Sequence, residues 1–203
     1  MANYVHKGDL PADVVFDGDI AVDTEAMGLN NLRDRLCVVQ LSDGKGDAHL
    51  VQIDPKTFDA PNLKKLLEDR SRVKLFHFAR FDVAILKCYL DADVQPIYCT
   101  KIASKMVRTF TERHGFKDLC RDLLAIDVSK QQQSSDWGAD ELTPEQISYA
   151  ASDVLYLHQL REKLDVLLER EGRTALAQAC FAFLPARAAL DLAGWPEVDI
   201  FAH

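Results

Sequence analysis

The stretch IAVDTEAMGL, residues 20–29, places two carboxylates directly behind a short apolar run. Residues 20–25 are predicted to form a strand, in which successive side chains point to opposite faces. Asp23 and Glu25 then share one face, where they could hold a hard cation such as Mg²⁺ or Mn²⁺. Because 32 of the 203 residues are acidic, the spacing alone fits a solvated strand end equally well. The rest of the chain has to separate these interpretations.

The segments after this stretch carry clear strand and helix patterns. Apolar runs at 35–43 and 47–53 flank the turn GKG, which is typical of a hairpin. Helical spacing of leucines and other apolar residues marks 60–70 and 79–90, with a short apolar strand at 73–78 between them. From about residue 100 onward the pattern is almost entirely helical.

Two signals mark the long helical part. Thr143, Pro144 and Gln146 have the arrangement of a capping box with proline in the first turn, so a helix is predicted to run from there to about residue 170. A later helix, after Gly172, is expected to break at Pro185. Strands first and helices later predict one α/β domain over residues 1–203, with a mixed central sheet flanked by helices and a helical C-terminal half.

Composition narrows the class of protein. The chain is 48% hydrophobic and 28% charged, which suits a globular domain with a sizeable core. A net charge of −8 argues against a protein that coats long duplex nucleic acid, since such proteins carry a basic stripe. The negative net charge is compatible with a nuclease, because an active site with several carboxylates is itself acidic.

The sequence shows no recognisable targeting signal. The N-terminal residues have no signal-peptide pattern, and no uncharged apolar run of about 18 residues is present, so no membrane association is expected. The five cysteines are widely spaced and are expected to be reduced and buried. A cytoplasmic location is the expectation.

Two later motifs bear on the acidic pair. FHFARFD, residues 76–82, places Asp82 in the first turn of a helix, where an acid alone can simply complement the helix dipole. YAASDVLYL, residues 149–157, places Tyr149 and Asp153 four residues apart and so on one helix face. Each signal is weak by itself, but in this fixed order they support a metal site.

A competing motif lies just upstream. VVFDGD, residues 14–19, resembles the opening motif of haloacid-dehalogenase-type phosphatases. That motif continues with Gly and then Thr or Val, whereas Asp19 is followed by Ile20 and Ala21. The phosphatase interpretation is therefore disfavoured.

The set D-T-E, H-x-x-x-F-D and Y-x-x-x-D resembles the three motifs of the DEDD exonuclease superfamily. The tyrosine points to the DEDDy branch, which includes ribonuclease D. The resemblance runs from about residue 10 to 170 and includes SSDWGADELTPEQISYAASDV, residues 134–154, in which Trp137 is expected to pack against the last helix of the motif set. It implies a ribonuclease H-like fold and a 3′–5′ exonuclease.

The resemblance also assigns roles. It implies that two divalent cations, Mg²⁺ or Mn²⁺, are held by the carboxylates of Asp23, Glu25, Asp82 and Asp153. Tyr149 would position or deprotonate the attacking water. The products would be nucleoside 5′-monophosphates released from a 3′ end.

The length of the chain suggests one type within the branch. About 30 residues follow the long helix, too few for the helical domains that ribonuclease D carries there. The chain looks most like the short NrnC type, which degrades very short single-stranded RNA down to dinucleotides. That resemblance implies a homo-oligomer, an octameric ring, with the helical segment at about 172–203 as a candidate subunit interface.

Several substrate contacts are expected near the motifs. DTEAMGL resembles the layout of oligoribonucleases, which makes Met27, Gly28 and Leu29 candidates and Leu29 a wedge between two bases; ordinary core is the alternative for Leu29. His77 is a candidate phosphate contact or a structural histidine, and Phe81 is a further substrate-binding candidate.

One basic cluster remains without an assigned role. Lys101, Lys105 and Arg108 fall on one predicted helix face, which is either solvated or receives a 5′ phosphate.

Two other functions remain open. One is trimming of longer RNA, such as tRNA 3′ ends, or of single-stranded DNA. The other is a non-catalytic RNA- or protein-binding module on the same fold, which is disfavoured because all five motif residues are present.

Overall fold

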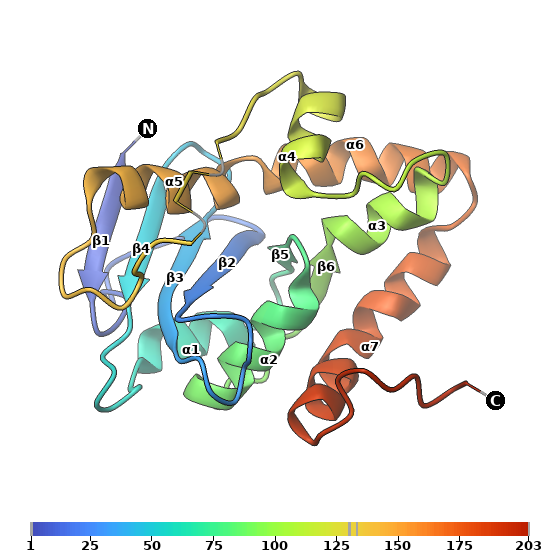
Figure 1. Cartoon of the computed structure of the whole chain (residues 1–203). Coiled ribbons are helices and arrows are strands. Elements are labelled where there is room, and N and C mark those ends of the chain that lie inside the picture. Colours follow the sequence, from blue (N-terminus) through green and yellow to red (C-terminus); the bar gives the residue numbers. More distant parts are fainter. Residues whose placement is uncertain (1, 130, 133, 203) are drawn as a thin grey trace.

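Six strands form one mixed sheet in the order β1-β4-β3-β2-β5-β6 (Figure 1). The antiparallel pairs are β2–β3 and β3–β4, and the parallel pairs are β1–β4, β2–β5 and β5–β6. The computed structural model describes residues 2–129, 131–132 and 134–202. The strands are Asn3–Lys7 (β1), Ile20–Ala26 (β2), Leu36–Ser42 (β3), Ala48–Gln52 (β4), Lys74–Phe76 (β5) and Ile97–Cys99 (β6).

Helices cover the sheet and fill the second half of the chain (Figure 1). Helix α5 packs across β1 to β4, and α7 packs along α2. The buried apolar side chains form one cluster between the sheet and these helices. The helices are Pro61–Glu68 (α1), Ala79–Leu90 (α2), Thr100–Val107 (α3), Phe116–Leu119 (α4) with a π-helical turn at Cys120–Leu124, Pro144–Leu155 (α5), Leu157–Arg170 (α6) and Thr174–Leu192 (α7).

The predicted hairpin is confirmed. Strands β3 and β4 pair antiparallel, and the turn between them contains Gly44 and Gly46, both at positive φ. Every residue of β3 is buried, because the strand lies inside the sheet between β4 and β2. This places β2, with the D-T-E motif, at the centre of the sheet.

The junction between β5 and α2 differs from the prediction. The strand expected at 73–78 ends at Phe76, so His77 and Phe78 form the connection to the helix. Phe78 has φ 71°, a left-handed conformation that is costly for a residue with a side chain. The sharp turn brings the first turn of α2, with Asp82, back toward β2.

The capping prediction is confirmed at the start of α5. The Thr143 hydroxyl accepts a hydrogen bond from the Gln146 backbone N–H, and the Gln146 side chain accepts one from the Thr143 N–H. The single long helix expected from there is divided, because Tyr156 separates α5 from α6. Helix α5 contacts β1 to β4, whereas α6 contacts β5.

The predicted break at Pro185 is wrong. Helix α7 runs through Pro185, although proline lacks the N–H that would bond to the carbonyl of residue 181. Packing of Ala177, Phe181, Leu184 and Ala188 into the core offsets that loss. The helical segment expected to reach residue 203 ends at Leu192.

An ion-paired cluster ties the end of α7 to the start of α2. The Arg80 guanidinium donates to both carboxylate oxygens of Asp191, at 2.6 and 2.8 Å. Arg187, one turn earlier on α7, also donates to Asp191 and to the carbonyl of Trp195. The chain after α7 is thereby held against α2.

Helix α7 also bears on the membrane prediction. By length and composition alone it is apolar enough to cross a membrane, and 22% of that window is buried inside the structure. A core helix passes the same test, so a single such helix is weak evidence. The expected lack of membrane association stays a prediction.

Candidate active site

Three motif carboxylates come together in one pocket. One oxygen from each of Asp23, Glu25 and Asp153 lies within 4.8 Å of the other two. Asp23 and Glu25 come from β2, where period-two alternation puts them on one face, and Asp153 comes from α5. The pairing predicted from strand spacing is therefore present.

Asp82 completes the group from the other side of β2. It is 3% exposed, and its Oδ1 accepts a hydrogen bond of 2.7 Å from the Thr24 hydroxyl. Thr24 lies between Asp23 and Glu25, so the same strand positions two acids on one face and holds Asp82 from the other. The four acids and Tyr149 line one cavity of about 600 Å³.

The electrostatics of the pocket are those of like charges packed together. Burial raises the pKa of Asp23 to about 7. Burial together with the charges of Asp23, Asp153 and Asp82 raises the pKa of Glu25 to about 10. Burial and the charge of Asp23 raise the pKa of Asp82 well above its usual range. A cation among these oxygens would relieve the repulsion.

Tyr149 lies beside this group on the same face of α5 as Asp153. Burial and the neighbouring carboxylates, Asp153 first, raise its pKa above the usual value. The centroid of its ring lies 6.0 Å from the centroid of the Trp137 ring, and Trp137 is 3% exposed. The prediction that Trp137 packs against the third-motif helix is confirmed.

All five predicted substrate contacts line the same cavity: Met27, Gly28, Leu29, His77 and Phe81. Leu29 is 89% exposed, so the alternative that it belongs to the core is wrong. The His77 Nδ1 lies 2.9 Å from the Thr100 hydroxyl, which itself donates to the carbonyl of Phe76. Because the hydroxyl hydrogen is used there, Nδ1 is the donor to Thr100.

The predicted basic face is only partly present. Arg108 follows the end of α3, is 4% exposed and donates to Asp122 at 2.5 Å, so it does not share a face with the two lysines. Lys105 is exposed on α3. Lys101 lines the pocket, with its ammonium 4.1 Å from the centre of the Phe78 ring.

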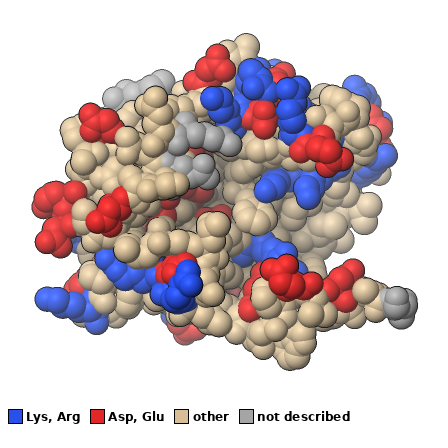
Figure 2. Space-filling view, in the orientation of Figure 1, with Lys and Arg blue, Asp and Glu red and all other residues tan. Residues whose placement is uncertain are grey.

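Other pocket residues were not predicted. They include Phe78, Phe116 and Lys117, together with Thr24, Ala26, Gly115, Val128, Ser129 and Ser135. Phe78 is adjacent to a predicted motif residue, but its left-handed backbone carries no sequence signal. Figure 2 shows a hollow near the centre of one face, with acidic atoms inside it and basic side chains along part of its rim.

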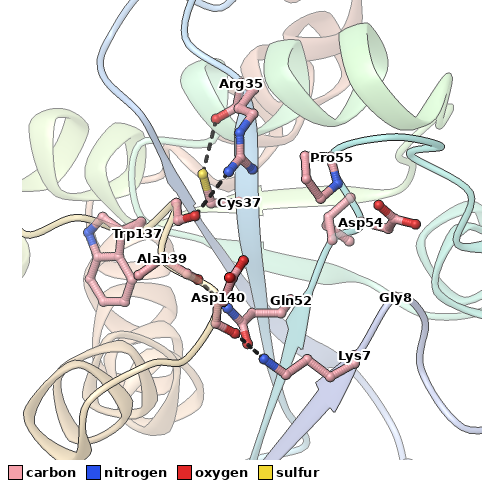
Figure 3. A pocket seen from close by; sticks show the side chains of 12 residues that line it. Lys7, Gly8, Arg35, Cys37, Gln52, Asp54, Pro55, Trp137, Ala139 and Asp140 are labelled. Carbon is pink, nitrogen blue, oxygen red and sulfur yellow. Dashed lines mark hydrogen bonds between the residues drawn. The ribbon is translucent and has the colours of Figure 1, made fainter.

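A second cavity of about 410 Å³ lies on the other side of the Trp137 segment (Figure 3). Its walls include Lys7, Arg35, Gln52 and Asp140. Lys7 donates to the carbonyl of Asp140, and Gln52 donates to that of Ala139. These bonds fix the loop between residues 137 and 140 against the sheet.

Comparison with known proteins agrees with this geometry. A family described as 3′–5′ exonuclease matches residues 9–169. Ribonuclease D of Acidiphilium cryptum is 34% identical over 154 residues, and that of Escherichia coli is 32% identical over 157 residues. The matches cover 76% and 75% of this chain, which spans about two fifths of the length of these curated relatives. The chain belongs to the 3′–5′ exonuclease family.

Within this family the chain is of the NrnC type. The structure of Brucella melitensis NrnC with bound Mg²⁺ is 54% identical, with a TM-score of 0.96 and all of both chains covered. The same protein bound to pGG is 55% identical, with a TM-score of 0.96, covering 100% of this chain and 99% of that one. Ribonuclease D of E. coli, at 29% identity, has a TM-score of 0.72 and covers 84% of this chain and 44% of its own. The predicted ribonuclease H-like exonuclease fold is confirmed.

Proposed function

We propose that the protein is a divalent-metal-dependent 3′–5′ exoribonuclease that hydrolyses very short oligoribonucleotides, dinucleotides included, to nucleoside 5′-monophosphates. One observation carries the proposal: four carboxylates and Tyr149 line a single pocket that also bears the exposed Leu29. The complex of the Brucella relative with pGG supports the choice of substrate.

The donor set fits hard cations. Asp23, Glu25, Asp82 and Asp153 offer only carboxylate oxygens, which Mg²⁺ and Mn²⁺ prefer. The Mg²⁺ bound to the Brucella relative supports this assignment. Two such cations, when bound, would activate water and stabilise the charge that develops on the leaving oxygen.

The remaining groups would orient the reactants. Tyr149, whose pKa lies above the ordinary tyrosine value of about 10, is protonated near neutral pH and would hold the attacking water through its hydroxyl. The Trp137 ring packs beside the tyrosine ring. His77 would contact a phosphate, with its tautomer set by Thr100.

The dimensions of the pocket favour a short substrate. A cavity of about 600 Å³ falls in the usual range for small-ligand sites, about 300–1,000 Å³. Leu29 would lie against a base, an apolar contact that needs no particular sequence. Longer RNA 3′ ends or single-stranded DNA are the alternatives that the following experiment separates.

A time course with 5′-labelled RNAs of two to about ten nucleotides, with Mg²⁺, with Mn²⁺ and with chelator, tests the proposal. We expect every length to be degraded to monophosphates, fastest for the dinucleotide, and only with metal. Accumulation of dinucleotides would overturn the dinucleotide assignment and leave the exonuclease assignment standing. Glu25→Gln should be inactive, and Asp93→Ala, at an exposed ion pair with Arg70 remote from the pocket, should match the wild type.

We also propose that the chain acts as a single exonuclease domain that assembles into a homo-oligomer, an octameric ring. Support comes from the segment at 172–203, where several large apolar side chains are exposed: Leu176, Phe183, Trp195, Val198, Ile200 and Phe201. A ring would restrict access to the sites and exclude long or folded RNA. A monomer by light scattering at micromolar concentration would refute the ring.

A further inference from the structure

The loop between β2 and β3, residues 27–35, holds apolar side chains out in solvent. Met27 is 52%, Leu29 89% and Leu32 63% exposed. Met27 and Leu29 line the carboxylate pocket. A flexible loop would pay ordering entropy when it contacts a ligand, so the usefulness of Leu29 depends on what fixes the backbone around it.

The carboxylate of Asp34 lies at the centre of this loop. Asp34 is only 8% exposed, and its Oδ2 accepts the Asn30 backbone N–H at 3.0 Å. The Arg33 guanidinium donates to both oxygens, at 2.6 and 2.9 Å. Hydrogen bonding from Arg33 and from the backbone N–H groups of Asn30 and Leu29 lowers the pKa of Asp34 to about 2. The loop therefore closes around a group that is charged near neutral pH.

Gly28 leaves the space that the carboxylate occupies. A Cβ at this position would lie 2.4 Å from Oδ2 and 2.8 Å from Cγ of Asp34. Both distances are too short for any side chain. Close approach of the Gly28 backbone is therefore what allows Asp34 to reach the N–H groups of Leu29 and Asn30.

The two ends of the loop are held as well. The Met27 N–H donates to the Arg35 carbonyl at 3.0 Å, and Arg35 donates to the Gly138 carbonyl at 3.2 Å (Figure 3). A Cβ on Gly138 would lie 2.5 Å from the Met27 sulfur, so the segment after Trp137 packs directly on the loop. Leu29 is thus the exposed point of a loop that is fixed internally and at its base.

We propose that Asp34 is a positioning residue for substrate length: it fixes the loop so that Leu29 stands at the pocket between the two bases that flank the scissile phosphate. This inference rests on the proposed function. Because Asp34 touches neither the carboxylates nor the reacting atoms, its removal affects the binding of a dinucleotide and leaves bond cleavage in the bound state nearly unchanged.

A double-mutant cycle on the dinucleotide pGG tests the coupling. Asp34→Ala and Leu29→Ala should each raise KM about tenfold while kcat changes less than about twofold, and the double variant should show no further rise. Multiplied effects in the double variant would mean that Asp34 does not act through Leu29, and would overturn the proposal. An equal fall of kcat and kcat/KM in Asp34→Ala would overturn it too.

A second substrate separates the positioning role of Asp34 from the proposed exonuclease function. The p-nitrophenyl ester of a nucleoside 5′-monophosphate offers the scissile phosphate but no second base for Leu29. Wild type, Asp34→Ala and Leu29→Ala should hydrolyse it at equal rates. If the wild type cleaves neither substrate, the proposed function fails; if it cleaves both and Asp34→Ala slows both equally, only the positioning role fails.

Two further variants serve as controls in case Asp34→Ala misfolds. Gly28→Ala adds the methyl group that collides with Asp34, and it should reproduce the rise in KM although the protein still contains the Asp34 side chain. Asp93→Ala removes a remote aspartate from an exposed ion pair and should leave both substrates unaffected. If Asp34→Ala does not fold by circular dichroism, Gly28→Ala decides the question, and a wild-type KM for that variant overturns the proposal.

Discussion

The hydroxyl of Thr24 donates a hydrogen bond of 2.7 Å to Oδ1 of Asp82, and both side chains are buried. The bond joins the central strand β2 to the first turn of α2. It uses one carboxylate oxygen of Asp82 and fixes the direction of the other. The middle residue of the D-T-E motif thus orients an acid 58 positions away.

Thr24→Val should weaken activity without unfolding the protein. The substitution keeps the shape but removes the donor, so Asp82 loses its orientation, and partners of metal-binding side chains typically contribute about 10–100-fold. We expect a loss of that order in kcat/KM on a dinucleotide and a weaker Mg²⁺ response by calorimetry. Thr24→Ser, which keeps the hydroxyl, should stay near the wild type; equal losses in both variants would contradict the role of this bond.

Tyr149→Phe should separate turnover from binding. Removal of one hydroxyl leaves the packing against Trp137 in place, so melting temperature and Mg²⁺ affinity should be unchanged. Loss of a group that positions the water should lower kcat about 10²–10⁴-fold. Single-turnover kinetics with labelled dinucleotide measure this directly, and near-normal turnover would remove Tyr149 from the mechanism.

Metal removal should destabilise the fold through the acidic cluster. A ligand that binds only the folded state raises its stability, so saturating Mg²⁺ should raise the melting temperature of the wild type by about 5 °C or more. Glu25→Gln replaces a carboxyl whose ionised form is disfavoured in the folded state by burial and by the neighbouring acids, so its metal-free form should melt above the metal-free wild type. A lower melting temperature for metal-free Glu25→Gln would argue against charge repulsion in the pocket.

The pair His6 and His49 should make the sheet edge sensitive to acid. The His6 Nε2 lies 3.0 Å from the His49 Nδ1, across the parallel pair β1–β4. Burial lowers the pKa of both rings, opposed by Asp13 near His6 and by Asp47 and Asp43 near His49. As the pH falls, the histidines of the unfolded chain take up protons before those of the folded chain. The contribution of this pair to folding stability is therefore fully present above about pH 6.5 and declines as the pH falls below it.

Thermal melts between about pH 7.5 and 5.5 check this prediction. The wild type should lose more stability on acidification than His6→Gln, which cannot gain that charge. Hydrogen exchange at the amides of β1 should rise over the same interval in the wild type alone. Parallel melting curves for the two proteins would show that the pair does not titrate in this interval.

Much of the fold follows from local patterns, and the rest depends on tertiary contacts. Strands β2 to β4 and helices α1, α2 and α5 carry periodicity, glycine turns or a capping box that can be read directly. Strand β1 is polar and mostly exposed at the sheet edge, and β6 has three residues, so neither has a distinctive pattern. At Pro185 the sequence predicts a break that the structure does not have. Packing against α2 keeps α7 intact at a residue where local chemistry alone would end the helix.

The site divides in the same way. Spacing placed the acids and Tyr149 on defined faces of a strand or helix, and the resemblance to the DEDD motifs joined them into one site. The Thr24–Asp82 bond, the positive φ of Phe78 and the inward turn of Arg108 join or depend on elements distant in sequence, and spacing contains no information about them. The exposure of Leu29 likewise required the structure of the loop around Asp34.

The contact between Arg80 and Asp191 has a practical consequence for handling this protein. Arg80 is two residues before Asp82 on α2, and the residues just after α7 are hydrogen-bonded to the same arginine cluster. A purification tag fused to the C-terminal end would therefore follow a segment that helps to anchor the helix that carries Asp82. Poor activity in such a fusion should first be compared with that of an N-terminally tagged protein before any residue of the pocket is held responsible.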